Sequence, residues 1–227
     1  KIKPDHAEAY NNMGNALKDK GDLKAAIDSF KQALKIKPDY TDAHYNIGAA
    51  LDERGDLEAA IDSYKQALKI NPNFAKAYYN IGSLLQKKGD PELAIDSYKL
   101  ALKAKPDYAE AYNNMGNALR NKGEVVAAIV SFKKALKIKP DYANAYNNMG
   151  NALQDGGDVE AAISSYQEAL KINPNYAKAY NNMAVLLENN GHAKAAIENY
   201  QEALKIKPDY AEAHYNMGNA LKEKGDL

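Results

Sequence analysis

The residue types that most often carry out catalysis are absent from this 227-residue sequence or scattered through it. There is no cysteine, which excludes a disulfide framework, a thiolate zinc site and a cysteine nucleophile. No two of the four histidines have the spacing of metal ligands; they are His6, His44, His192 and His214. The recurring serines are predicted on the solvent side of helices, not on a strand-to-helix turn. We therefore predict a protein that is not an enzyme, with no metal site and no cofactor.

Asparagine is the polar residue with the most regular placement. It recurs every 34 residues, at Asn12, Asn46, Asn80, Asn114, Asn148, Asn182 and Asn216. Further asparagines lie directly before this row, at Asn11, Asn113, Asn147 and Asn181, or one helical turn after it, at Asn15, Asn117, Asn151 and Asn219. Asparagine inside a helix costs roughly 0.5 kcal/mol relative to alanine, so the row needs a physical explanation.

One explanation is binding of a polypeptide backbone. A side-chain amide has a donor and an acceptor, so it can hold one peptide unit of an extended chain by two hydrogen bonds. Each bond contributes only about 0.5–1.5 kcal/mol, and we predict weak, additive binding along the row and its polar neighbours. The alternative is that these asparagines bond between repeats or persist from recent duplication, as the near-identical segments 109–119 and 143–153 suggest.

Lysines form a second regular series, and it has two explanations. They are Lys35, Lys69, Lys103, Lys137, Lys171 and Lys205. They can form a basic edge for an acidic partner. Their predicted place at helix C-termini, where cations interact favourably with the helix dipole, explains them as well.

Composition limits the partners. The 30 basic and 30 acidic residues cancel, which argues against a general nucleic-acid binder. No apolar run approaches the roughly 20 residues that cross a bilayer. The absence of cysteine fits a reducing, intracellular and presumed cytoplasmic compartment. Both ends fall inside the repeat pattern, so we expect a fragment of a longer protein.

Proline and glycine recur with the same 34-residue period as the asparagines and lysines. They mark the ends of the helices that position those side chains. The prolines are Pro4, Pro38, Pro72, Pro106, Pro140, Pro174 and Pro208, and the glycines are Gly21, Gly55, Gly89, Gly123, Gly157, Gly191 and Gly225. Between them, apolar residues at helical spacing predict two helices per unit. The repeats are 7–40, 41–74, 75–108, 109–142, 143–176 and 177–210, after the end of a preceding repeat at 1–6 and before a half repeat at 211–227. The sequence predicts one all-α domain over residues 1–227.

Helix ends are predicted from capping residues. Three first helices are predicted to begin after an N-cap aspartate with a glutamate three residues on: Asp5 with Glu8, Asp107 with Glu110, and Asp209 with Glu212. Each second helix is predicted to follow a left-handed glycine and an N-cap aspartate, such as Asp22. Asp90 is followed by Pro91, at the first helical position.

The eight recurring positions resemble the tetratricopeptide repeat (TPR) family. In the first unit they are Tyr10, Met13, Gly14, Leu17, Ala26, Phe30, Ala33 and Pro38. The resemblance covers the whole chain, and implies a right-handed superhelical solenoid whose first helices line the concave side. Departures are Ala184 for the close-packing glycine, His44 and His214 for the aromatic, and His192 for the capping aspartate.

The asparagine row resembles the ladder in the TPR superhelix of O-linked N-acetylglucosamine transferases, and this resemblance implies that it holds polypeptide. A second TPR mode, a clamp for a C-terminal carboxylate, requires lysines that here match only at Lys76 and Lys178. A complete clamp is therefore not expected. Both lysines are kept as predicted peptide contacts.

Three functions remain open at this stage. The leading hypothesis is a protein-interaction scaffold that binds extended polypeptide in a concave, asparagine-lined groove. A second is the substrate-recruiting arm of a larger enzyme, such as a glycosyltransferase. A third is a structural or engineered solenoid that self-associates end to end through apolar faces on its terminal repeats.

Overall fold

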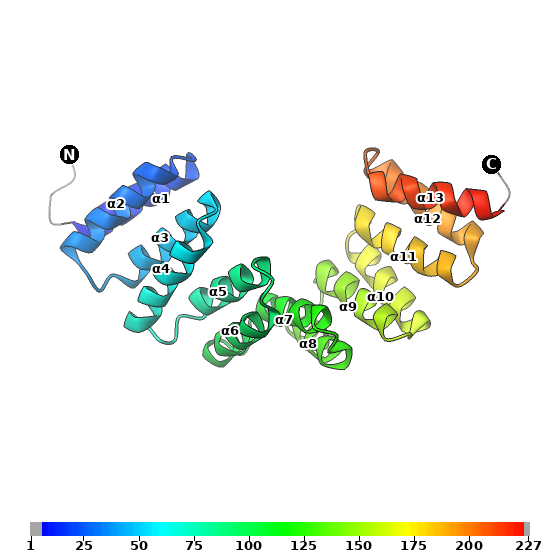
Figure 1. Cartoon of the computed structure of the whole chain (residues 1–227), viewed down its shortest axis with the longest axis horizontal. Coiled ribbons are helices and arrows are strands. Elements are labelled where there is room, and N and C mark those ends of the chain that lie inside the picture. The colour runs from blue at the N-terminus through cyan, green and yellow to red at the C-terminus, as the bar shows by residue number, and fades with distance from the viewer. Residues whose placement is uncertain (1–5, 225–227) are drawn as a thin grey trace. The chain divides into compact units, whose positions relative to one another are not determined.

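The computed structural model describes residues 6–224, which form helices and no strand (Figure 1). In chain order the helices are α1 (Ala7–Asp19), α2 (Leu23–Ile36), α3 (Thr41–Arg54), α4 (Leu57–Ile70), α5 (Ala75–Lys87), α6 (Pro91–Ala104), α7 (Ala109–Asn121), α8 (Val125–Ile138), α9 (Ala143–Asp155), α10 (Val159–Ile172), α11 (Ala177–Asn189), α12 (Ala193–Ile206) and α13 (Ala211–Lys224). The odd-numbered helices are the predicted first helices and the even-numbered helices the predicted second helices. The fold is all-α, as predicted.

The chain divides into two compact units, residues 1–111 and 112–227, and the division falls in the first turn of α7. Within the first unit each first helix packs against its own second helix, as α1 does against α2, and α2 and α4 each pack against the next first helix. The second unit repeats this arrangement from α8 to α13. Successive repeats of a unit therefore share one continuous core, as expected for helical repeats that cannot bury their apolar faces alone.

Glycine turns connect the two helices of each repeat, as predicted. Six of the recurring glycines, from Gly21 to Gly191, have φ angles between 78° and 91°. This left-handed conformation is strained for residues that carry a Cβ atom. Gly225 lies outside the described residues.

The caps of the second helices follow the prediction in three repeats. Asp22, Asp90 and Asp158 each accept a hydrogen bond from the backbone N–H three residues on, at 3.0, 3.2 and 3.1 Å. Pro91 occupies the first helical position of α6. Elsewhere the N-cap residue has no side-chain cap bond; these residues are Asp56, Glu124 and His192. Three aspartate side chains thus satisfy an N–H group that lacks a partner within its helix.

The predicted caps of the first helices are wrong. Helices α7 and α13 begin at Ala109 and Ala211, so Asp107 and Asp209 lie one residue before the N-cap. Asp5 lies outside the described residues. The N-cap is an aromatic residue without a side-chain cap bond in four first helices: Tyr40, Phe74, Tyr142 and Tyr176. Packing explains the shift, because an aromatic such as Tyr40 lies against a cluster of buried alanines.

The contact between the helices of one repeat depends on a glycine in the first and an aromatic ring in the second. A Cβ atom added at Gly150 would lie 2.6 Å from Cε1 of Tyr166, and one at Gly14 would lie 2.4 Å from Cε1 of Phe30. Both rings are fully buried. Burial also raises the pKa of Tyr166 well above its ordinary value near 10. These aromatics therefore belong to the core.

The serines of the second helices are not on the solvent side, so that prediction is wrong. Ser29, Ser97, Ser131 and Ser165 are buried. For Ser29, Ser131 and Ser165 the reason is that α2, α8 and α10 also pack against the following first helix. The hydroxyls of Ser97, Ser131 and Ser165 donate to the backbone carbonyl four residues earlier at 2.8–2.9 Å. Their hydrogen-bonding capacity is used inside the helix.

Candidate functional site

The recurring asparagine row lies on the first helices, and its exposure varies. Asn12 is exposed, whereas Asn46, Asn80, Asn114, Asn148, Asn182 and Asn216 are half-buried. Half-buried amides are held by the protein on one side and open to solvent on the other. The contacts on the protein side decide which atoms remain for a ligand.

In the first unit the row bonds between repeats. Nδ2 of Asn46 donates to Oδ1 of Asn11 at 3.0 Å, across 35 residues. Nδ2 of Asn80 donates to the hydroxyls of Tyr45 and Tyr64, both at 3.1 Å. Asn11 and Tyr45 occupy the same repeat position, so each amide contacts the same position of the preceding repeat.

The second unit has the same arrangement with asparagine at both positions. Nδ2 of Asn148 donates to Oδ1 of Asn113 at 3.0 Å. Nδ2 of Asn182 donates to Oδ1 of Asn147 at 3.1 Å and of Asn151 at 3.0 Å. The interpretation that the asparagines bond between repeats is therefore correct for these two, as it is for Asn46 and Asn80.

The asparagines directly before the row do not line an open surface, so their predicted placement is wrong. Asn11, Asn113, Asn147 and Asn181 are only 5, 4, 0 and 0% exposed. Asn11, Asn113 and Asn147 receive the bonds described above from the next repeat, whereas Nδ2 of Asn181 donates to Glu212 at 3.4 Å. Asn113 and Asn147 thus support the row and are not open to a ligand.

These bonds change what the row can offer. An amide nitrogen has two hydrogens, and both are used in Asn80 and in Asn182. Each of these residues keeps only its carbonyl oxygen for a ligand. The predicted two-bond grip on a peptide unit therefore reduces, at these positions, to accepting one N–H.

One open pocket lies on the first helices of the second unit. Its volume is about 300 Å³, and it is lined by Arg120, Asn151, Gln154, Asp155, Lys178, Asn182, Val185 and Glu212. It brings together three predicted contacts: Asn151, Asn182 and Lys178. The charged residues Arg120, Asp155 and Glu212 were not predicted. The pocket therefore holds both signs of charge.

An ion pair forms part of this pocket and also joins two repeats. Nε of Arg120 lies 2.5 Å from a carboxylate oxygen of Asp155, 35 residues later. In the first unit Lys87 and Asp52 form the corresponding pair at 2.9 Å, with the charges exchanged. Opposite charges 35 residues apart are visible in the sequence, and this spacing could have identified the Arg120–Asp155 pair.

The remaining predicted contacts are less constrained. Asn15 and Asn117 are half-buried on α1 and α7, and Lys76 is exposed on α5. Lys76 and Lys178 lie in different units. Neither unit therefore contains both lysines, and the incomplete carboxylate clamp stays a prediction.

Two of the four histidines contact the protein backbone. Nε2 of His44 and His214 lies 3.1 and 2.9 Å from the carbonyl oxygens of Pro38 and Pro208. Among the described residues, no three histidine, aspartate or glutamate side chains cluster as metal ligands would. The lysines of the basic edge, from Lys35 to Lys205, are exposed in the last turns of the second helices.

None of the helices within residues 6–224 is long and apolar enough to span a bilayer.

Comparison with known proteins agrees with this geometry. A family model described as TPR repeat matches residues 14–52, 52–89, 116–157, 150–191 and 193–225. Two models described as tetratricopeptide repeat match residues 75–108 and 177–207. No curated protein sequence matches the chain.

Several solved structures are similar. A chain of the APC/C hetero-tetramer Cut9–Hcn1 matches with a TM-score of 0.79 at 20% identity, over 96% of this chain and 43% of that one. This chain thus spans less than half of that relative. MamA matches with a TM-score of 0.66 at 30% identity, over 73% of this chain and 97% of MamA. YrrB, a TPR protein with an unusual peptide-binding site, matches with a TM-score of 0.66 at 23% identity, over 82% and 96%.

Stacked helical repeats present extended surfaces for binding other proteins, and chains of this fold are typically non-catalytic. The 34-residue period, the glycine–aromatic contact within five hairpins and the family models together cover nearly all of the sequence. This chain belongs to the tetratricopeptide repeat family of protein-interaction scaffolds.

Proposed function

We propose that this scaffold binds extended polypeptide along its first helices, in a groove lined by the asparagine row. The observation that carries the proposal is the state of Asn46, Asn80, Asn148 and Asn182, which are half-buried and whose amide nitrogens are engaged between repeats, so that their carbonyl oxygens remain to accept hydrogen bonds. Such oxygens accept hydrogen bonds from backbone N–H groups, which every extended chain except proline offers. Recognition would then depend little on the ligand's side chains.

The pocket of the second unit supplies the side-chain preference. It places Lys178 and Arg120 near Asp155 and Glu212 around two amides, Asn151 and Asn182. Polar and charged side chains of a ligand fit this lining better than aliphatic ones, because burying a charge without a partner is costly. The bound segment is thus expected to be polar as well as extended.

The specific alternative is that the row only joins repeats. The hydrogen bonds of Asn46, Asn80, Asn148 and Asn182 favour it, since all of them run to neighbouring helices. A substrate-recruiting arm of a larger enzyme would use the same groove, and full-length sequence containing a catalytic domain would distinguish that case.

The test compares two double alanine variants, both of which break the Asn148–Asn113 and Asn182–Asn147 bonds. Asn148→Ala with Asn182→Ala removes the surface amides, whereas Asn113→Ala with Asn147→Ala removes their buried partners. Binding to a library of extended peptides is measured for both, after circular dichroism has established that both fold. We expect only the first pair to lose binding.

Peptides methylated at backbone nitrogens provide an independent readout. Methylation removes the donor that the carbonyl oxygens need, so it should weaken binding at matching positions. Equal loss in both variant pairs, or binding that is indifferent to methylation, would show that the row is structural. Binding by neither the wild type nor any variant leads to the same conclusion.

A further inference from the structure

The outward stripe of α8 differs from that of every other second helix. Val126, Val130, Lys133 and Lys137 are spaced by four, three and four residues, so they follow one another along a single face. Val126 is 78% exposed and Val130 49% exposed. This spacing is that of the narrow seam by which two helices pack as a coiled coil.

Other repeats have charged or polar residues at the positions of the two valines. The pairs are Lys24 and Asp28, Glu58 and Asp62, Glu92 and Asp96, Glu160 and Ser164, and Lys194 and Glu198. In addition, α8 is the one described second helix with no acidic residue. Its outward face is therefore apolar at the N-terminal half and basic at the C-terminal half.

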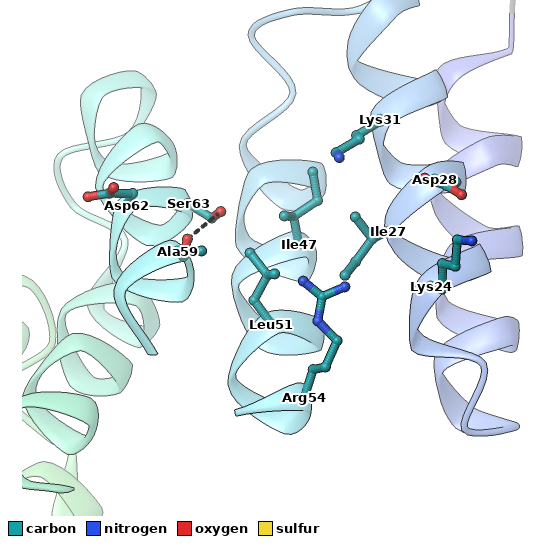
Figure 2. A pocket seen from close by; sticks show the side chains of 10 residues that line it. All are labelled: Lys24, Ile27, Asp28, Lys31, Ile47, Leu51, Arg54, Ala59, Asp62 and Ser63. Atoms are coloured by element: carbon teal, nitrogen blue, oxygen red, sulfur yellow. Dashed lines mark hydrogen bonds between the residues drawn. The ribbon is translucent and has the colours of Figure 1, made fainter. Parts of the chain in front are cut away.

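A pocket in the first unit shows the usual state of this surface. In Figure 2, Lys24, Asp28 and Lys31 extend from α2 and Arg54 from α3, around Ile27 and neighbouring aliphatic side chains. Charged groups thus surround a small apolar floor, in a pocket of about 490 Å³.

Three repeats further on, the same positions have lost most of that charge. Val126 and Val130 stand in place of Lys24 and Asp28, and Gly156 in place of Arg54. Ser164 stands in place of Asp62. Lys133 is the charge that remains at these positions, so the equivalent surface of α8, α9 and α10 is largely apolar.

The lysines of the stripe lack the partners found elsewhere. Lys99 pairs with Asp96 at 3.1 Å, three residues before it on α6. The residue three before Lys133 is Val130, and neither Lys133 nor Lys137 forms an ion pair with any residue in the described range. Both ammonium groups are exposed and open to an acidic partner.

We propose that the outward stripe of α8 is a docking site for an acidic amphipathic helix of a partner protein. The partner would place an aliphatic pair over Val126 and Val130, and aspartate or glutamate opposite Lys133 and Lys137. An amphipathic helix buries its apolar face in this way in many complexes. Charge complementarity sets which end of the partner meets which end of α8. The site is separate from the asparagine row.

Two fluorescent model peptides test the proposal with the whole chain. Each is a helix of about three turns or more with leucine at two successive seam positions and glutamate at the next two, in one order or the reverse. Control peptides carry lysine in place of glutamate, or the same residues moved off the seam. Fluorescence anisotropy should show saturable binding of one acidic order, weakened by added salt.

The protein variants are matched by repeat position. Val126→Glu with Val130→Asp introduces the pair that α6 already carries at Glu92 and Asp96, so the fold accepts it. We expect at least about tenfold weaker binding. Lys194→Glu with Glu198→Asp places the same pair on α12, and it should bind like the wild type.

Three results would overturn the proposal. The first is no saturable binding of either acidic order. The second is equal binding by the Val126→Glu, Val130→Asp variant. The third is self-association of the wild type in sedimentation velocity that this variant abolishes, because the occupant is then a second copy. Asn148→Ala with Asn182→Ala should leave acidic-helix binding unchanged, which separates this site from the groove.

Discussion

Replacing Asn182 by alanine measures how much the asparagine row contributes to the stability of the fold. Asn182 donates to Asn147 at 3.1 Å and to Asn151 at 3.0 Å. In this variant Oδ1 of Asn151 still accepts a hydrogen bond from the hydroxyl of Tyr166 at 2.8 Å, so Asn151 is not left without a partner. Asn147 is fully buried, and its side-chain nitrogen already has no hydrogen-bond partner. The variant therefore leaves both of its polar atoms unpaired.

The expected loss of stability follows from the polar atoms of Asn147 that are left unpaired. A buried polar group without its partner costs about 1–3 kcal/mol. Alanine is a better helix former than asparagine by about 0.5 kcal/mol, which offsets part of the loss. We expect Asn182→Ala to lower the free energy of unfolding by about 0.5–2.5 kcal/mol. The melting temperature should fall by about 2–4 °C for each kcal/mol lost.

Urea and thermal unfolding followed by circular dichroism provide the assay. Asn12→Ala is the matched control, because Asn12 is exposed and makes no hydrogen bond within the described residues. Its stability should stay the same or rise slightly. Asn147→Ala with Asn182→Ala should cost less than the two single changes summed, since both belong to one interaction. If Asn182→Ala and Asn12→Ala unfold alike, the argument for an inter-repeat role is refuted.

Three further predictions concern packing, charge and pH. Gly150→Ala should lower stability by about 1–3 kcal/mol, because the new Cβ would lie 2.6 Å from the buried ring of Tyr166; an unchanged urea midpoint would contradict this. Arg120→Met should cost at most about 1 kcal/mol and less in high salt, because the Arg120–Asp155 pair is about one-third exposed; an effect that grows with salt would contradict it. Burial raises the pKa of Tyr166, whereas in the unfolded chain it titrates near pH 10. The contribution of the Tyr166 hydroxyl to the free energy of unfolding is therefore complete below about pH 10 and is lost as pH rises further. Tyr166→Phe should reduce this alkaline loss in urea titrations at about pH 9 and about pH 11, and an equal loss in both proteins would exclude the explanation.

Much of the architecture follows from local sequence. Gly21 ends α1 and Asp22 begins α2, as predicted, because conformational preference and a cap bond act within a few residues. The N-caps of the first helices were placed wrongly for the opposite reason. Tyr40 takes that position because its ring packs against alanines of other helices, and such a contact has no local signal.

The asparagine row shows the same limit more clearly. The sequence by itself determined that Asn148 and Asn182 share a repeat position off the apolar stripe. Only the tertiary structure decided that Asn113 and Asn147 lie beneath them, because burial depends on how the next repeat covers a helix. Likewise, the residue types at Val126 and Val130 are plain in the sequence. Their exposure is set by which helices pack around α8, and packing between helices is a property of the assembled chain.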